Sequence, residues 1–238
     1  MTDPLALDTE RLAAWMNDHV AGFRGPLVAT KFKGGQSNPT YRIDAPSGTC
    51  VLRRKPAGKL LASAHAVDRE YRVLRALHGS GVPVAAPLAL CADESVIGSM
   101  FYLMAHVDGR IFWDPALPAI ARDERAAYYD EIVRVLAAIH AVDPASAGLA
   151  DYGRPGNYFA RQIARWSEQY RAAETERLEP MEHLLQWLPA HCPADDGSAS
   201  LVHGDYRIDN LIFHPDEPRI LAVVDWELST LGHPLADF

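Results

Sequence analysis

The sequence predicts an α+β protein with two lobes, because its apolar pattern changes character near residue 110. Before that point, short apolar runs alternate with a period of two between Gly- and Pro-containing turns, which is typical of strands. From Arg122 onward, apolar residues recur at helical spacing over longer segments. We therefore predict a first, sheet-containing lobe over 1–106 and a larger, mainly helical lobe over 107–238.

The first lobe is expected to begin with a helix and to continue into an antiparallel sheet. Leu12, Trp15, Met16 and Val20 have helical spacing and predict a helix over 7–20. Three short strands, a second helix and two further strands follow, and the five strands would form one antiparallel sheet. The expected strands cover 27–33, 40–44, 49–54, 88–92 and 99–106, and the expected second helix covers 63–78.

The second lobe is expected to contain three helices separated by Pro- and Gly-containing loops. The predicted helices cover 122–140, 157–174 and 177–191. A short apolar strand before His203 then leads into the part of the chain that carries the candidate chemistry.

Composition narrows the class of protein. The 238 residues are 48% hydrophobic, as in an ordinary globular protein, and the net charge of −8 argues against nucleic acid as a main partner. No apolar run is long enough to cross a bilayer, and Met1-Thr2-Asp3-Pro4 lacks the features of a signal peptide, so we expect a cytoplasmic protein without a membrane span. The three cysteines have no metal-ligand spacing and are expected to be reduced thiols.

Basic residues outnumber acidic ones over residues 31–75, although the chain as a whole is acidic. A basic lobe beside an acidic one suits a bound polyphosphate, with the acidic side binding a metal ion. The competing interpretation is a solvated charged surface.

A polar motif at 203–210 carries the strongest functional signal. Asp205 and Asn210 lie five positions apart before one apolar run, and Asp225 ends the next run. Phosphoryl transfer from ATP needs a carboxylate for the acceptor hydroxyl, here Asp205, and oxygen ligands that hold Mg²⁺ against the phosphates, here Asn210 and Asp225. The alternative is that these side chains only cap a loop.

A glycine-bearing hairpin joins the first two expected strands. It contains Gly34, Gly35, Ser37 and Asn38. Glycines leave no side chain in the way, so the N–H groups of this hairpin are able to close over phosphates.

The Asp-x-x-x-x-Asn spacing also matches the catalytic loop of protein kinases, although Gly204 stands where those enzymes usually have arginine. With His-Gly-Asp-x-x-x-x-Asn at 203–210 and Gly-Gly-Gln-Ser-Asn-Pro-Thr-Tyr at 34–41, the chain resembles the aminoglycoside phosphotransferase, or kinase-like, family. It is similar to the subgroup found ahead of an acyl-CoA dehydrogenase domain in fusion proteins. The resemblance implies a bilobal protein-kinase-like fold, with a nucleotide-binding lobe over 1–106, a catalytic lobe over 107–238, and further helices after Phe238.

The resemblance also implies roles for residues outside the motif. Arg53 occupies the place of the kinase lysine that reaches the α- and β-phosphates, and Glu70 occupies the place of its glutamate partner. A plain surface Arg–Glu pair is the alternative, with Arg54 and Lys55 as other candidates for the phosphates. The backbone near His106 and Val107 would read the adenine edge.

Arg207 follows Asp205 by two positions, where protein kinases often carry a lysine that touches the transferred phosphate. It would neutralise charge on that group. An ion pair at the surface or between the lobes is the alternative.

The predicted function is ATP- and Mg²⁺-dependent phosphorylation of a hydroxyl on a small molecule. The family implies an aminoglycoside-like acceptor, and the subgroup implies a hydroxyacyl-CoA-like acceptor. The residues of the two motifs favour the hydroxyacyl-CoA-like acceptor. Two alternatives remain: a catalytically silent nucleotide- or acyl-CoA-binding module that partners an acyl-CoA dehydrogenase, and metal-assisted hydrolysis by His203 with the aspartates.

Overall fold

The computed structural model of the chain describes residues 7–32, 38–56, 66–154 and 156–238. The chain divides into two compact units, one made of 1–138 with 205–228 and the other of 139–204 with 229–238. None of the helices in the described ranges combines the length and the apolar character that a bilayer crossing requires. The division into lobes near residue 106 stays a prediction.

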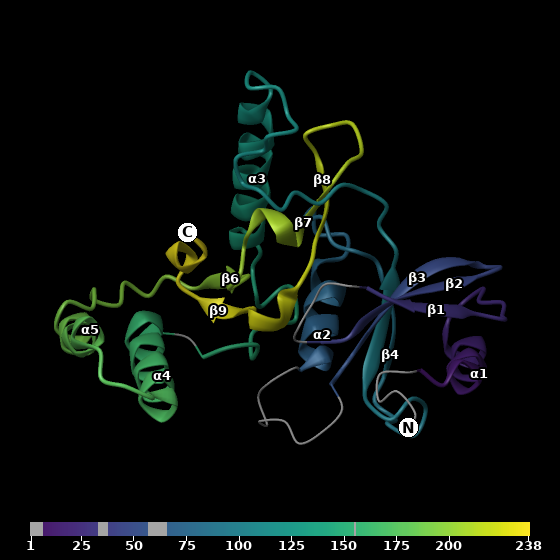
Figure 1. Cartoon of the computed structure of the whole chain (residues 1–238), viewed down its shortest axis with the longest axis horizontal. Helices are drawn as coiled ribbons and strands as arrows, with labels where there is room; N and C mark the ends of the chain where they lie inside the picture. The colour runs from purple at the N-terminus through teal and green to yellow at the C-terminus, as the bar shows by residue number, and fades with distance from the viewer. Residues whose placement is uncertain (1–6, 33–37, 57–65, 155) are drawn as a thin grey trace. The chain divides into compact units, whose positions relative to one another are not determined.

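The first unit contains a five-stranded sheet in the order β1-β2-β3-β5-β4 (Figure 1). Each neighbouring pair is antiparallel, so the predicted α+β fold with its antiparallel sheet is confirmed. The strands are β1 (Val28–Lys31), β2 (Thr40–Ala45), β3 (Gly48–Arg54), β4 (Pro87–Cys91) and β5 (Phe101–Ala105).

Alternation along β3 assigns its residues to two faces of the sheet. Leu52 lies in an apolar cluster with Leu12 and Met16 of α1 (Thr9–His19), which therefore covers one face. Arg53 points the other way and meets α2 (Val67–Leu77), which contacts β4 and β5. The predicted helix start at 63 lies outside the described residues.

The segment 205–228 belongs to the same unit as the sheet. It forms a two-stranded antiparallel pair of β7 (Leu211–Phe213) and β8 (Ile220–Val223). The N–H of Val223 donates to the carbonyl of Pro83 at 2.9 Å, and Arg110 and Phe213 exchange two backbone bonds of 2.8 Å. Helix α3 (Arg125–His140) adds a contact, because the Tyr206 hydroxyl donates to the Ile132 carbonyl at 2.8 Å. These bonds hold the segment 205–228, with Asp205, Asn210 and Asp225, within the sheet-bearing unit.

The second unit contains the remaining helices and a second short strand pair. Strands β6 (Ser200–Val202) and β9 (Thr230–Gly232) pair antiparallel. Helices α4 (Tyr158–Ala173) and α5 (Glu179–Ala190) match the predicted ranges within two residues at each end. They are joined by a bidentate ion pair in which Arg171 donates to both oxygens of Glu182, at 2.5 and 2.8 Å.

Candidate active site

The β7–β8 pair brings Asn210 and Asp225 to the same end of two neighbouring strands. Asn210 immediately precedes β7, and Asp225 follows β8 by two residues. The N–H of Val224 donates to the carbonyl of Asn210 at 2.9 Å, which locks the two segments together. Asp225 has a φ of 65°, in the left-handed region that non-glycine residues seldom adopt. Strained conformations of this kind gather at functional sites, because the surrounding contacts must hold them.

Asp205 and Asn210 are held together by the loop between them. The side-chain amide of Asn210 donates to the Asp205 carbonyl at 2.9 Å and to its carboxylate at 3.0 Å. These bonds use the nitrogen of the amide, and the carbonyl oxygen of the same side chain is the atom that suits a metal ion. The Asp205 side chain is 37% exposed, so its carboxylate is accessible from solvent.

Arg53 is the buried cation of the site. It is 8% exposed, and its Nε lies 3.0 Å from a carboxylate oxygen of Glu70, which is 1% exposed. The hydroxyl of Tyr102 in β5 donates to the same Glu70 oxygen at 3.1 Å. The pair that the sequence predicted therefore forms inside the protein and not at its surface.

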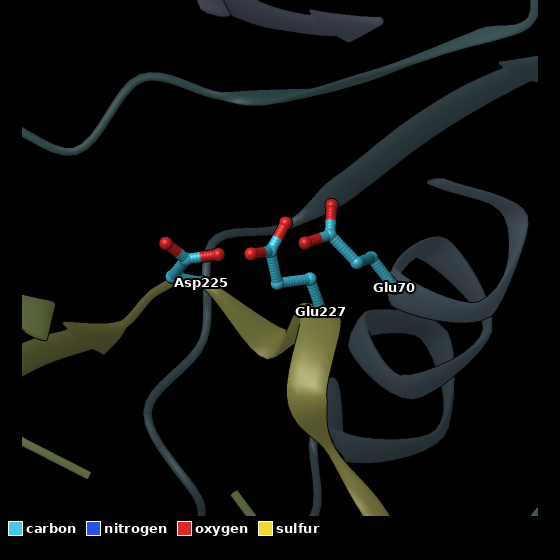
Figure 2. Close-up of side chains that lie close together, drawn as sticks. All are labelled: Glu70, Asp225 and Glu227. Carbon is cyan, nitrogen blue, oxygen red and sulfur yellow. The ribbon is translucent and has the colours of Figure 1, made fainter. Parts of the chain in front are cut away.

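Arg53 also contacts the segment that follows β8. Its Nη2 donates to Asp225 at 2.5 Å and to Glu227 at 3.4 Å. Figure 2 shows the carboxylates of Glu70, Asp225 and Glu227 side by side, the first from α2 and the others from the segment after β8. One oxygen from each lies within 4.8 Å of the others. One guanidinium leaves these three carboxylates with an excess of negative charge, which a divalent cation on the hard oxygen donors of Asp225 would balance.

The electrostatics of the cluster follow from burial and crowding. Burial raises the pKa of Glu70 to about 7; Arg53 opposes the rise, whereas Asp225 and Glu227 add to it. Burial alone would lower the pKa of Arg53, but the neighbouring Glu70, Tyr102 and Asp225 raise it above its usual value. Arg53 therefore stays charged, whereas burial favours the neutral form of Glu70.

The structure separates the other basic candidates from the cluster. Arg54 is 4% exposed and donates from Nε to Ser99 at 2.9 Å, on the opposite face of β3 from Arg53. Arg207 is 61% exposed and makes a bidentate pair with Asp209, while its Nε lies 3.9 Å from Asp205. The surface ion pair that was the alternative role for Arg207 is thus present, formed with Asp209. The guanidinium also lies near the carboxylate of Asp205.

The other predicted binding residues are His106, Val107 and those of the segment 34–38. His106 and Val107 are half-buried in the extended segment directly after β5. Asn38 is 1% exposed and donates to Glu227 at 3.2 Å. Gly34, Gly35 and Ser37 lie outside the residues that the structure describes.

Sequence reasoning missed three residues, two of them at this cluster and one in the second unit. Glu227 and Tyr102 contact the Arg53–Glu70 pair, and the Asp-x-Glu spacing of Asp225 and Glu227 was the available signal for the first. In the second unit, the buried Asp237 accepts from the N–H groups of His203 and Gly204 at 2.9 and 2.7 Å, and from His140 at 2.9 Å. No local pattern indicates that bond set, because its partners are far apart in sequence. The pKa of Asp237 is lowered: burial would raise it, but the bonds from His140 and the two amides outweigh burial.

Comparison with known proteins identifies the family of the chain. The model of the phosphotransferase enzyme family, APH, matches residues 28–238. The chain belongs to this family. A crystal structure of a candidate aminoglycoside phosphotransferase from Ralstonia eutropha has a TM-score of 0.87 and 56% identity, covering 98% of this chain and 68% of that one.

Two further proteins resemble this APH chain, one closely in sequence and one mainly in fold. Mouse acyl-CoA dehydrogenase family member 10 is 51% identical over 213 residues, which are 90% of this chain and 20% of that protein. The chain thus spans a fifth of the length of that curated relative. A thermostable mutant of the aminoglycoside phosphotransferase APH(4)-Ia, solved in a ternary complex with ADP and hygromycin B, has a TM-score of 0.62 at 16% identity. The match covers 94% of this chain and 73% of that one. At that identity the likeness shows the fold alone.

Proposed function

We propose that this chain is the nucleotide-binding and catalytic part of an ATP- and Mg²⁺-dependent phosphotransferase that acts on a hydroxyl group of a small molecule. The observation that carries the proposal is the direct contact between Arg53, paired with the buried Glu70, and Asp225, the residue assigned to the metal. Phosphoryl transfer depends mainly on positioning and on charge stabilisation, which such a preorganised cluster supplies.

Each residue of the proposed site has a separate role. Asp205 receives the proton of the acceptor hydroxyl as the new bond to the γ-phosphorus forms and the bond to the β–γ bridging oxygen breaks, so that ADP leaves with the electron pair. Asn210 and Asp225 would hold Mg²⁺, which would neutralise charge on the phosphates. Arg53 binds the phosphates, together with the Gly34, Gly35, Ser37 and Asn38 hairpin.

The proposal divides the chain into a nucleotide lobe over 1–106 and a catalytic lobe over 107–238. In the first, backbone groups of His106 and Val107 bind the adenine edge. In the second, Arg207 leaves Asp209 to neutralise charge on the transferred group. That exchange requires little movement, because the Arg207 guanidinium is exposed and already 3.9 Å from Asp205.

For the acceptor we favour a hydroxyacyl-CoA-like molecule over an aminoglycoside. Support comes from the acyl-CoA dehydrogenase relative, which shares 51% identity with this chain. An acyl-CoA dehydrogenase domain, fused or separate, is the matching partner. Hygromycin B in the distant APH(4)-Ia complex is the observation that favours an aminoglycoside.

Two assays test the proposal. Isothermal titration of ATP with and without Mg²⁺ measures the nucleotide site, and transfer of labelled γ-phosphate is then measured with hydroxyacyl-CoA thioesters and with aminoglycosides. We expect Mg²⁺-dependent ATP binding and transfer to a hydroxyacyl-CoA. Binding without transfer to any hydroxylated acceptor would favour the silent module, and no binding at all would reject the nucleotide site.

A further inference from the structure

Glu227 links three elements of the first unit. Its carboxylate accepts from Asn38, which precedes β2, at 3.2 Å and from Arg53 of β3 at 3.4 Å. It lies two residues after Asp225, in the turn of residues 226–228 that packs against α2. The side chain is 19% exposed, so both contacts form largely away from solvent.

Arg53 has more carboxylates around it than one guanidinium needs. The shortest contact, 2.5 Å, is between its Nη2 and Asp225. The contact belongs to the metal-free protein, in which Arg53 occupies the carboxylate that we assign to the metal. A divalent cation bound to Asp225 would repel a guanidinium bonded to the same carboxylate, so Asp225 would exchange Arg53 for the cation. With Asp225 turned to a cation, Glu70 still holds Nε, and Glu227 is the carboxylate that remains for Nη2.

The burial of Asn38 is an independent sign that the contact with Glu227 stabilises this region. The Asn38 side chain is 1% exposed, and its amide nitrogen donates to Glu227. Its Oδ1 is buried without a hydrogen-bond partner in the described part of the chain. If the bond to Glu227 were lost, the buried amide of Asn38 would bear the full cost of desolvation. The bond therefore fixes the start of β2 to the segment that carries Asp225.

We propose that Glu227 is a positioning residue of the phosphotransfer site, which holds Arg53 and Asn38 in place while Asp225 binds the metal ion. The inference rests on the proposed function, and it adds a residue that acts through Arg53 and Asn38 and touches neither phosphate nor acceptor. Supporting groups around a metal ligand usually change metal affinity by about 10–100-fold when they are removed. Glu227 should therefore matter for Mg²⁺ more than for the nucleoside.

Three substitutions separate positioning from simple packing. Glu227→Gln keeps an oxygen that accepts from Asn38 but removes the charge that Arg53 needs. Glu227→Ala removes both contacts, and Glu227→Asp keeps the charge on a shorter side chain. Glu94→Gln, at an exposed glutamate in the turn between β4 and β5, is the matched control.

The measurement is isothermal titration of Mg²⁺ into the ATP-saturated protein, together with adenosine affinity and thermal unfolding of the metal-free protein. We expect Glu227→Gln to weaken Mg²⁺ by about 10–100-fold with adenosine affinity unchanged. Glu227→Asp should recover part of that loss, and Glu94→Gln should match the wild type.

The outcomes distinguish the inference from the function on which it rests. Wild-type Mg²⁺ affinity in Glu227→Gln, with or without a fall in melting temperature, would overturn the positioning role and leave the phosphotransferase intact. An equal loss of adenosine and Mg²⁺ affinity would overturn it as well, because it would mark a general packing defect. If the wild type binds neither ATP nor Mg²⁺, both proposals are rejected together.

Discussion

Replacing Arg53 by methionine should uncover a buried negative charge. Arg53 and Glu70 are 8% and 1% exposed, and the substitution leaves the Glu70 carboxylate beside Asp225 and Glu227 without its cation. Breaking a buried pair in this way costs about 3–5 kcal/mol, a large share of the stability of an ordinary domain. Methionine fills much of the space of the arginine stem, so the loss reports charge more than packing.

The assay is urea unfolding of the metal-free protein, with Arg42→Met on the adjacent strand as the control. Arg42 pairs with Asp44 at 2.9 Å, but the two side chains are 47% and 40% exposed, and such pairs contribute about 0–1 kcal/mol. Adding Glu70→Gln to Arg53→Met should recover part of the lost stability, because the amide carries no charge.

The loss of stability caused by Arg53→Met should also depend on pH. Without Arg53, the pKa of Glu70 rises further, because Arg53 has the largest lowering effect on it and only the hydrogen bond from Tyr102 still lowers it. The variant is then closest to wild type in acid, where Glu70 is neutral, and furthest from it at neutral and higher pH. A loss no greater than that of Arg42→Met, or one that Glu70→Gln leaves unchanged, would refute the reasoning.

Three further predictions concern metal, packing and pH. Asp225→Asn should abolish Mg²⁺-dependent ATP binding, seen by calorimetry, while circular dichroism stays native; unchanged binding would remove Asp225 from the metal site. Gly109→Ala should destabilise the protein by about 1–3 kcal/mol in urea unfolding, because a Cβ there would lie 2.3 Å from the Phe213 carbonyl oxygen and would push against β7. An unchanged unfolding free energy would mean that the backbone at Gly109 does not pack this closely against Phe213. The pKa of Glu70 is raised on folding from 4.5 to about 7, so its stabilisation is complete below the lower value and is lost as pH rises through the higher one. Unfolding free energy of the metal-free wild type measured against pH should show this fall, and Glu70→Gln should lack it.

Most of the fold was predictable from local patterns. Period-two runs indicated all five strands, and helical spacing indicated α1, α3, α4 and α5, because these elements bury regular faces. Element ends were less accurate: the strand expected from Ser99 begins at Phe101, and Ser99 lies just before it, where its hydroxyl accepts from Arg54. The two-unit division could not be read from sequence, since it groups 205–228 with a sheet formed far earlier in the chain.

The site was predictable where spacing along the chain carries the chemistry. Asp205, Asn210 and Asp225 were identified from two neighbouring apolar runs, and the structure brings the segments of Asn210 and Asp225 together through the Val224 bond. The roles of Glu227 and Tyr102 depend on contacts across different elements. Such contacts follow from the folded arrangement, and nothing in the neighbouring residues encodes them.

The most direct test of the central claim is transfer of labelled γ-phosphate to a hydroxylated acceptor by the wild type and by Asp205→Ala, with ATP affinity measured in parallel. The account predicts transfer that falls about 10²–10⁴-fold in the variant, the usual scale for a positioned general base, while ATP binding changes little. Transfer by Asp205→Ala at near the wild-type rate, or a loss of ATP affinity as large as that of Asp225→Asn, would contradict the assignment of Asp205 as the carboxylate that faces the acceptor.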